Sequence, residues 1–494
     1  MLLKSFQRLG SKHRLQKYDI SNGIALSCAR CVTTPLAHET VTSRQIPETL
    51  LQALSTHPKL SVDRVPDAGR GLFATLPIGY GETILVERPM LCYPSHKALN
   101  MVCYSCLRLL DATADVVTSP LSGHRFCSDA CVVSAESDFH AMESLTLEAK
   151  ASILGSVPDI NTAVSCSAQD GPQCSTSNQV VPPLSQFHDM CNAHGGERFP
   201  LMAARLAFSR LSKSLKNLPG KLELSSNPIL PEGPISGHQP SQQPQSTYAL
   251  QHEGPHGVKR SLSQDCGGSE QNKLICGDPC SDLDFLCYAN VSKPYPVHWI
   301  DLYSLLQLAM RQAVLRVESQ LLAVTGEGMA EVEGHTDGPT LQRLSALKSE
   351  LEHLSLDWFV SVLARLHINV FRVSCMVPPG ALIGVANASG SSSATSSSSP
   401  WSGMGAMTSG SGAFLVASLF NHSCEPNVEI VFRRNDATAS FVAVRDIDKG
   451  EQLFVSYIDE AMGVQHRQDY LHFSYGFRCG CQRCIEELHD LMQK

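Results

Sequence analysis

Three cysteines close to the C-terminus have the spacing of a metal site. The segment FRCGCQRC places Cys479, Cys481 and Cys484 in a C-x-C-x2-C pattern. Cysteine thiolates are ligands of zinc, and a structural zinc site takes four ligands in a tetrahedron. One ligand is therefore missing from this segment. We predict that Cys424 supplies it, because Cys424 follows an apolar run inside an otherwise polar turn.

Four cysteines nearer the N-terminus form a second group. Cys103 and Cys106 are a C-x2-C pair, and Cys127 and Cys131 are a C-x3-C pair further along. Two pairs at a separation of about 20 residues complete one four-thiolate site. The chain has 19 cysteines and no secretory signal pattern, which favours metal ligation over disulfides. We predict about two zinc ions per chain.

Other metal-capable residues do not complete a site in the sequence. His140 follows the second cysteine pair, but no further C-x2-C pair accompanies it, so we predict a surface histidine. The pairs Cys28 with Cys31 and Cys276 with Cys280 each lack a partner pair. We leave both unassigned, because coincidence explains their spacing.

The segment LFNHSCEPN, residues 419–427, is polar at the point where an apolar run ends. Turns after a buried strand normally use Gly, Asp or Ser, which face water at little cost. Here Asn421, His422 and Cys424 follow the apolar residues 413–420 instead. These side chains can bind a ligand or a metal, so we predict that this turn belongs to a functional site.

Composition limits the classes of protein that the chain can be. Its 494 residues, 43% of them hydrophobic, predict two to four domains with a sizeable core. The net charge of -8 argues against a broad nucleic-acid surface. We find no run of about 18 apolar residues, and therefore expect no membrane-spanning helix.

The first 18 residues hold five Lys or Arg and no acidic residue. This composition is typical of a mitochondrial transit peptide, and a basic disordered leader is the alternative. We expect a protein of the cytoplasm or nucleus. If the basic segment is a transit peptide, the mitochondrion is the alternative location.

Hydrophobic patterns place these motifs on a mixed α+β chain. Residues 60–91 read as a compact β unit, and four short apolar runs near residues 412–420, 428–432, 439–447 and 452–458 read as strands. Helical spacing occurs at residues 198–215, about 300–323 and 340–366. Polar composition predicts solvated insertions at residues 158–190 and 224–285, and a Gly/Ser linker at 379–412.

Five motifs in this order resemble the SET and MYND domain (SMYD) family of protein-lysine methyltransferases. They are GRGLFAT, CYSC with FCSDAC, LFNHSCEPN, GEQLFVSYID and YGFRCGCQRC. The resemblance implies a SET-domain β fold with a pseudoknot-like crossing, an inserted MYND-like zinc finger and a helical insert. It also implies the following segments: leader 1–56, SET 57–100, finger 101–142, helical insert 143–378, linker 379–412, SET 413–460, post-SET zinc segment 461–494.

The resemblance also implies a task for individual residues. The cofactor would be S-adenosylmethionine, and its binding residues would be Arg70, Gly71, Leu72, Asn369, Asn421, His422, Tyr457 and Phe477. Tyr457 matches the active-site tyrosine, and Tyr475 and Phe477 match the walls of the substrate-lysine channel. The cysteine site that contains Cys424 would hold the C-terminal segment across the channel.

Methyl transfer to an amine requires a neutral lysine, in-line alignment and exclusion of water, which aromatic walls can provide. The implied partner is a protein with a target lysine, histone or non-histone, and we expect a monomer that binds neither nucleic acid nor membrane.

Two departures from the family and two competing functions accompany this interpretation. The cysteines of the finger match only the first of its two usual zinc sites, and the short C-terminus resembles the branch without a helical-repeat domain. The first alternative is a catalytically inactive SET-fold adaptor that depends on zinc. The second is a DNA-binding zinc protein, which the acidic charge balance disfavours.

Overall fold

The computed structural model describes residues 27–28, 46–66, 68–110, 116–120, 122–146, 181–194, 198–216, 275–326, 338–377 and 405–493. The leading basic residues 1–18 and most of the predicted insertions lie outside these ranges. The described chain combines helices and strands, which confirms the predicted α+β class.

Strands from the two ends of the chain make up the β part of the molecule. They are β2 (Leu60–Val65), β3 (Gly69–Ala74), β4 (Thr83–Arg88), β5 (Leu91–Pro94), β8 (Ile275–Cys276), β10 (Val370–Val377), β11 (Gly405–Ala413), β12 (Asn421–His422), β13 (Val428–Val431), β14 (Ala439–Ala443) and β15 (Phe454–Val455). The largest sheet has the order β13-β14-β4-β8, and a second has the order β10-β11-β5. Because β4 pairs with β14 and β5 pairs with β11, residues near the N-terminus and residues near the C-terminus share both sheets.

Two smaller pairs complete the strands of the described chain. β1 (Ser27–Cys28) pairs with β9 (Ala289–Asn290), and β6 (Val117–Thr118) pairs with β7 (Arg125–Phe126) in the finger. β12 runs parallel to β15, which brings the polar turn of LFNHSCEPN beside the segment that leads to Tyr457.

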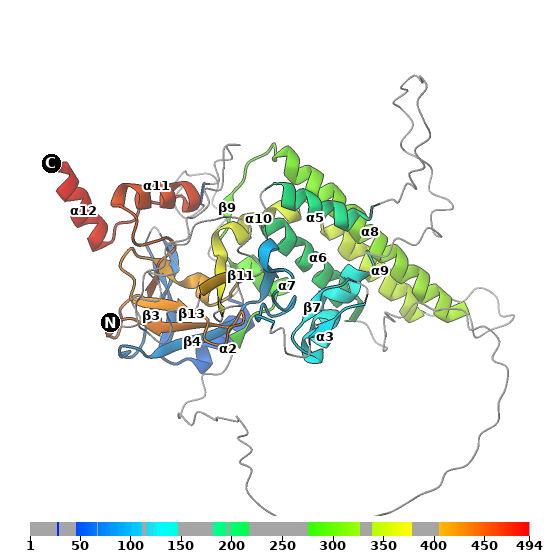
Figure 1. The fold of residues 1–494 in the computed structure, drawn as a ribbon, viewed down its shortest axis with the longest axis horizontal. Helices are drawn as coiled ribbons and strands as arrows, with labels where there is room; N and C mark the ends of the chain where they lie inside the picture. Colours follow the sequence, from blue (N-terminus) through cyan, green and yellow to red (C-terminus); the bar gives the residue numbers. More distant parts are fainter. Residues whose placement is uncertain are drawn as a thin grey trace, which may run out of the picture.

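Helices lie at both ends of the sheets, with most of the long helices on one side and the last two helices of the chain at the opposite end (Figure 1). They are α2 (Glu48–Thr56), α3 (Asp129–Ala135), η3 (Glu136–His140), α4 (Ala141–Ser144), α5 (Pro183–Ala193), α6 (Arg198–Lys216), α7 (Pro279–Asp282), α8 (Val297–Gly326), α9 (Gly338–His353), α10 (Leu356–Asn369), α11 (Val464–Tyr475) and α12 (Gln482–Met492). Short turns of 3-10 helix occur at η2 (His96–Ala98), η4 (Leu283–Phe285) and η6 (Ala417–Leu419). α6 is the central helix, because it packs against the finger helices as well as α9 and α10.

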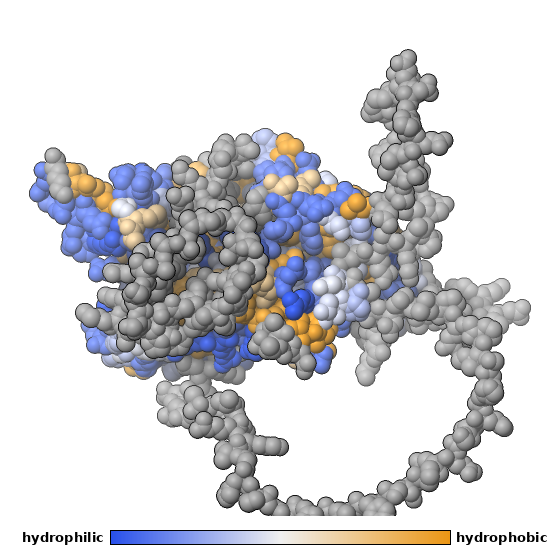
Figure 2. All heavy atoms as spheres, viewed as in Figure 1, coloured by the Kyte–Doolittle hydropathy of each residue, from blue (hydrophilic) through white to orange (hydrophobic). Residues whose placement is uncertain are grey.

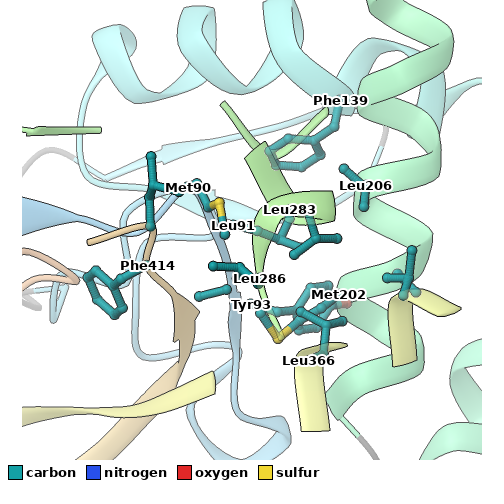
Figure 3. Close-up of a cluster of buried hydrophobic side chains, with 14 of the residues drawn as sticks. Met90, Leu91, Tyr93, Phe139, Met202, Leu206, Leu283, Leu286, Leu366 and Phe414 are labelled. Atoms are coloured by element: carbon teal, nitrogen blue, oxygen red, sulfur yellow. The ribbon is translucent and has the colours of Figure 1, made fainter. Parts of the chain in front are cut away.

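The core joins the sheets to the helices. Figure 3 shows Leu91 and Phe414 from the β part on one side and Met202 and Leu206 of α6 on the other. Leu283 lies between them, and all of these side chains are buried. Burial of this apolar surface therefore fixes the helices against the sheets that carry the polar turn.

The helix predicted at 340–366 is two helices. α9 ends at His353 and α10 begins at Leu356. The Ser355 hydroxyl accepts a hydrogen bond from the backbone N–H of Trp358 at 3.2 Å, which is a standard N-cap. The apolar pattern continues across the break, so the pattern alone did not reveal the serine cap.

The predicted Gly/Ser linker is wrong for residues 405–412. They form most of β11, which lies between β10 and β5. A Cβ on Gly410 would overlap with the carbonyl oxygen of Tyr93, and it would meet Leu107 Cδ1 at 2.7 Å. The small residues are therefore a packing requirement here, because larger side chains would separate the strands and the finger.

Three further predictions need correction. The leader is ordered in part, because α2 buries Leu50. The predicted solvated insertions contain α5, with Phe187 buried, and η4, with Phe285 buried. The apolar run 412–420, predicted as a strand, leaves β11 after Ala413 and forms η6.

The surface gives no sign of a membrane-spanning segment in the described ranges, where no helix is long and apolar enough to cross a bilayer. Figure 2 shows a mostly hydrophilic surface in this view, with hydrophobic residues at places such as the C-terminal helix α12. Ile485 and Leu491 of that helix are exposed.

Candidate active site and cysteine centres

The four cysteines of the C-terminal group come together. Their sulfur atoms, which belong to Cys424, Cys479, Cys481 and Cys484, all lie within 4.8 Å of one another. The Cys424 and Cys484 sulfurs are 3.4 Å apart. Tetrahedral zinc with bonds of 2.3 Å separates its sulfur ligands by about 3.8 Å, so the four thiols fit zinc. The hydrogen bond from Cys424 lowers the pKa of Cys479, against the effect of burial.

The finger brings its four cysteines together in the same way. The sulfur atoms of Cys103, Cys106, Cys127 and Cys131 also lie within 4.8 Å of one another. Hydrogen bonds from Cys106 and Cys131 lower the pKa of the Cys103 thiol, which favours the thiolate that zinc requires. Four converging sulfurs therefore fit zinc in the finger as well.

We predicted a surface histidine at position 140, and this prediction is wrong. His140 is buried, with 2% of its surface exposed. Its Nε2 lies 3.2 Å from the hydroxyls of both Ser119 and Ser122, and its Nδ1 lies 3.2 Å from a Glu143 carboxylate oxygen. The Tyr104 hydroxyl donates to the other oxygen of Glu143. The histidine is thus held by hydrogen bonds to serines and a carboxylate, and the sequence search for cysteine pairs could not detect this arrangement.

The Glu143 carboxylate is ionised in this network. Burial acts to raise its pKa, but the hydrogen bond from His140 and the charges of its neighbours outweigh burial and lower the pKa to about 2. The buried Glu143 carboxylate therefore joins Tyr104 and His140 through two hydrogen bonds, and these bonds stabilise this part of the structure.

The polar turn lies against Arg70, Gly71 and Leu72, the predicted cofactor-binding residues of strand β3. The Asn421 side-chain amide donates to the Arg70 carbonyl at 3.2 Å. A Cβ added to Gly71 would meet Asn421 Nδ2 at 2.9 Å and Gln452 Nε2 at 2.5 Å. Leu72 accepts a backbone hydrogen bond from Leu453 at 2.8 Å. Glycine at position 71 therefore permits close approach of β3, the polar turn and the segment before β15.

Both ring nitrogens of His422 have neighbours inside the protein. Nδ1 accepts the backbone N–H of Tyr457 at 3.1 Å, and Nε2 lies 3.3 Å from the Cys424 sulfur. Because Nδ1 accepts, Nε2 carries the proton and donates toward the sulfur. His422 therefore connects the cysteine centre to the predicted active-site tyrosine, and only its backbone stays available to a cofactor.

Aromatic rings gather beside this histidine. The Tyr457 ring centroid lies 5.3 Å from that of His422 and 5.0 Å from that of Tyr475. Phe477 lies 6.0 Å from His422 and 6.4 Å from Tyr475. The Tyr457 hydroxyl donates to the Phe420 carbonyl at 2.5 Å, which fixes its direction. The structure thus brings together all the aromatic residues predicted for the channel.

Arg70 and Asn369 meet a segment that the sequence prediction overlooked. Arg70 Nη2 donates to the Phe285 carbonyl at 2.6 Å, and its guanidinium lies 3.6 Å from the Phe285 ring centroid. Asn369 is buried at the end of α10, and its amide donates to the Cys287 carbonyl at 2.7 Å. Residues 285–287 therefore bridge β3 and α10, and they belong to the predicted helical insert 143–378.

Asn427 is a second overlooked residue. It is fully buried, and its amide donates to the Gln452 carbonyl at 2.8 Å and accepts from the Phe454 N–H at 2.7 Å. This side chain therefore holds the polar turn against β15. Its position at the end of LFNHSCEPN was visible in the sequence, but its partners were not.

The comparisons with known proteins agree with this architecture. A model of the SET domain family matches residues 244–458. The chain is 23% identical to Histone-lysine N-methyltransferase ATXR4 of Arabidopsis thaliana over 427 residues, which cover 86% of each chain. It is 44% identical over 81 residues to Histone-lysine N-methyltransferase SMYD3 of Homo sapiens, and 38% identical over 84 residues to Protein-lysine N-trimethyltransferase SMYD5 of Danio rerio.

Residues 244–458 are therefore similar to the SET domain. SET and MYND domain proteins are among the relatives of the chain, as the motifs had indicated. The two SMYD matches cover 16% of this chain, and they cover 18% of the SMYD3 protein and 20% of the SMYD5 protein. The leading strands β2 to β5 lie outside the matched residues 244–458, but β4 and β5 pair with strands inside that range.

Proposed function

We propose that the protein is an S-adenosylmethionine-dependent protein-lysine N-methyltransferase. The observation that carries the proposal is the arrangement around His422, where Tyr457, Tyr475 and Phe477 lie together beside the turn that contains Asn421. The relatives whose names state lysine methylation, and the SET-domain match, support the same reaction.

The surroundings of Gly71 in β3 fit a small polar cofactor. Gln452 Nε2 is buried and has no hydrogen-bond partner among the described residues. It lies beside Gly71, whose missing side chain leaves room for Asn421 on the same side. A buried donor without a partner costs free energy unless a ligand accepts from it. Arg70, Gly71, Leu72, Asn421 and the His422 backbone would therefore hold S-adenosylmethionine together with Gln452.

Each residue of the aromatic group has a distinct task in this proposal. When bound, S-adenosylmethionine supplies an electrophilic methyl group on its sulfonium. Tyr457 is held by its hydrogen bond to the Phe420 carbonyl, so its ring keeps one orientation toward the lysine. Tyr475 and Phe477 exclude water from the target amine. Exclusion of water lowers the pKa of that lysine, and the neutral amine is the nucleophile.

The C-terminal cysteine centre has a supporting task. Zinc at Cys424, Cys479, Cys481 and Cys484 would fasten the post-SET segment, which carries Tyr475 and Phe477, to the polar turn. In the same proposal the finger is MYND-like and binds a single zinc ion. The substrate is a protein with an accessible lysine.

The test uses purified protein, a cell extract and S-adenosylmethionine that carries a radiolabelled methyl group. We expect wild-type protein to label protein bands. Tyr457→Phe removes the hydroxyl that fixes the ring, and we expect it to lower labelling by about tenfold or more. If the wild type neither labels any protein nor binds the cofactor in calorimetry, the proposal is wrong. If Tyr457→Phe labels as well as wild type, the assigned task of Tyr457 is wrong.

A further inference from the structure

A buried carboxylate on β4 holds the segment that precedes the polar turn. Glu87 has 0% exposure. One of its oxygens accepts backbone hydrogen bonds from Leu415 at 2.8 Å and Val416 at 2.9 Å, and the other accepts from Ala417 at 2.9 Å. Three consecutive N–H groups therefore converge on one side chain. Glu87 lies outside all the motifs that indicated a site in the sequence.

The three anchored residues lead directly into the predicted active site. Ala417 begins η6, which ends at Leu419, and β12 (Asn421–His422) follows after Phe420. The Phe420 carbonyl is the acceptor of the Tyr457 hydroxyl. The segment that Glu87 holds thus carries both the expected cofactor contacts and the group that orients the tyrosine.

The backbone of Glu87 is itself held firmly. It pairs with Ala439 of β14 on one side and with Ile275 of β8 on the other. The carboxylate is therefore a fixed point in the largest sheet. Residues 414–416 belong to no strand, so no strand pairing holds them. The Glu87 carboxylate therefore joins β4, a leading strand, to this part of the closing segment.

A carboxylate in this position is costly for the fold. Burial raises the pKa of Glu87 to about 7, and the three N–H groups offset only part of that effect. An apolar side chain of similar size would avoid the desolvation cost, although it would leave three N–H groups without acceptors. The arrangement is suited to fixing a backbone segment in one conformation.

We propose that Glu87 is a positioning residue for methyl transfer, because its carboxylate fixes residues 415–417 and through them the cofactor-contacting turn at Asn421 and His422. The link to methyl transfer rests on the proposed function. The fixation of the backbone does not, so the two can fail separately.

The test compares Glu87→Gln with Glu82→Gln in the full chain. Glutamine keeps the size of the side chain, but its NH2 group is a donor. In the variant it would face a backbone N–H group that donates to a carboxylate oxygen in the wild type. Glu82 is a matched control, because it lies just before β4 and accepts from the Gly79 N–H, but it is half exposed and paired with Lys59.

We expect Glu87→Gln to weaken cofactor binding by about tenfold in calorimetry, since the segment must be ordered again on binding. The kcat at saturating cofactor should also fall, because the same segment carries the Phe420 carbonyl that orients Tyr457, whereas the KM for the protein substrate should change by less than about threefold. Hydrogen exchange should become faster in residues 413–424 and stay unchanged in β4 and β14. Glu82→Gln should match wild type in each measurement.

Two results would overturn the inference. One is unchanged exchange in residues 413–424 of Glu87→Gln. The other is faster exchange throughout β4 and β14 with a proportional loss of all activity parameters, which would show a purely structural role. If wild-type protein does not bind the cofactor, the proposed function is wrong, and the exchange measurement still decides whether Glu87 fixes the turn.

Discussion

The two cysteine centres contain the same ligands but have different surroundings. In the finger, Cys103 is buried and the other three cysteines are partly exposed, whereas in the C-terminal centre only Cys481 is partly exposed. Next to the finger cysteines lies the network of His140, and next to the C-terminal cysteines lies His422.

The contacts of these two histidines differ in the same way as the surroundings of the two cysteine centres. His140 connects serines to Glu143 inside the finger and reaches no residue predicted for the active site. His422 connects the Cys424 sulfur to the backbone of Tyr457. We infer that one centre stabilises a peripheral module, and that the other sets the geometry of the proposed reaction.

The finger nevertheless contacts the β part directly. The Cys106 carbonyl accepts the N–H of Ala437, and Arg108 forms an ion pair with Asp436 at 3.6 Å. The Arg108 side chain is 52% exposed, so this ion pair contributes at most about 1 kcal/mol. The contacts place the finger on the loop between β13 and β14, away from the polar turn.

The largest expected effect separates the two centres by mutation. Cys424→Ser and Cys131→Ser should each lower the zinc content by one ion per chain, since each removes a ligand. Structural zinc contributes on the order of 10 kcal/mol to the folding of small zinc domains. We therefore expect Cys424→Ser to disorder the C-terminal segment and abolish methyl transfer, whereas Cys131→Ser keeps the cofactor affinity within about threefold.

Metal analysis and calorimetry on the same preparations measure this prediction. Ser423→Ala is a control for the polar turn, because its hydroxyl contacts only the backbone of Glu425. Equal loss of cofactor binding in both cysteine variants would erase the distinction between the two centres.

The second effect concerns the hydrogen-bond network of His140 and Glu143. His140→Ala leaves the buried Glu143 carboxylate without one of its two hydrogen-bond partners, so we expect a loss of about 3 kcal/mol in the free energy of unfolding. Chemical denaturation measures this loss. His466→Ala, on an exposed face of α11, should change the free energy by less than about 0.5 kcal/mol.

The zinc content decides between two interpretations of the same variant. It should stay at about two ions per chain in His140→Ala, because the histidine holds hydrogen bonds rather than metal. A drop of one ion would show that His140 is a ligand and that the network is a metal site.

The third effect appears only as a change with pH, and it concerns the segment before the polar turn, which Glu87 holds without metal. Folding raises the pKa of Glu87 from 4.5 to about 7, so between these values the folded protein keeps a proton that the unfolded chain releases. Stability therefore falls as pH rises through this window. The wild type should lose about 3 kcal/mol relative to Glu87→Gln between about pH 4.5 and 7.

Denaturation of both proteins at several pH values measures the difference, and subtraction removes the contribution of all other groups. A constant difference across the window would mean that Glu87 has an ordinary pKa.

Residue type and spacing revealed both cysteine centres and the aromatic group, because metal ligation and ring packing restrict which residues can serve. The sequence did not reveal β11, since Gly410 becomes a strand residue only through the close approach of Tyr93. It also did not reveal His140 or Glu87, whose partners are ordinary serines and backbone N–H groups far away in the chain. Partners of this kind leave no recognisable pattern in the sequence around His140 or Glu87.

The most direct test of lysine methylation is mass spectrometry of extract proteins that the purified protein has methylated with S-adenosylmethionine carrying a deuterated methyl group. We predict labelled methyl groups on lysine side-chain nitrogens, and loss of these labelled peptides when Tyr457→Phe replaces wild type. Label that falls only on residues other than lysine, or label that persists unchanged in Tyr457→Phe, would contradict the proposed reaction at this site.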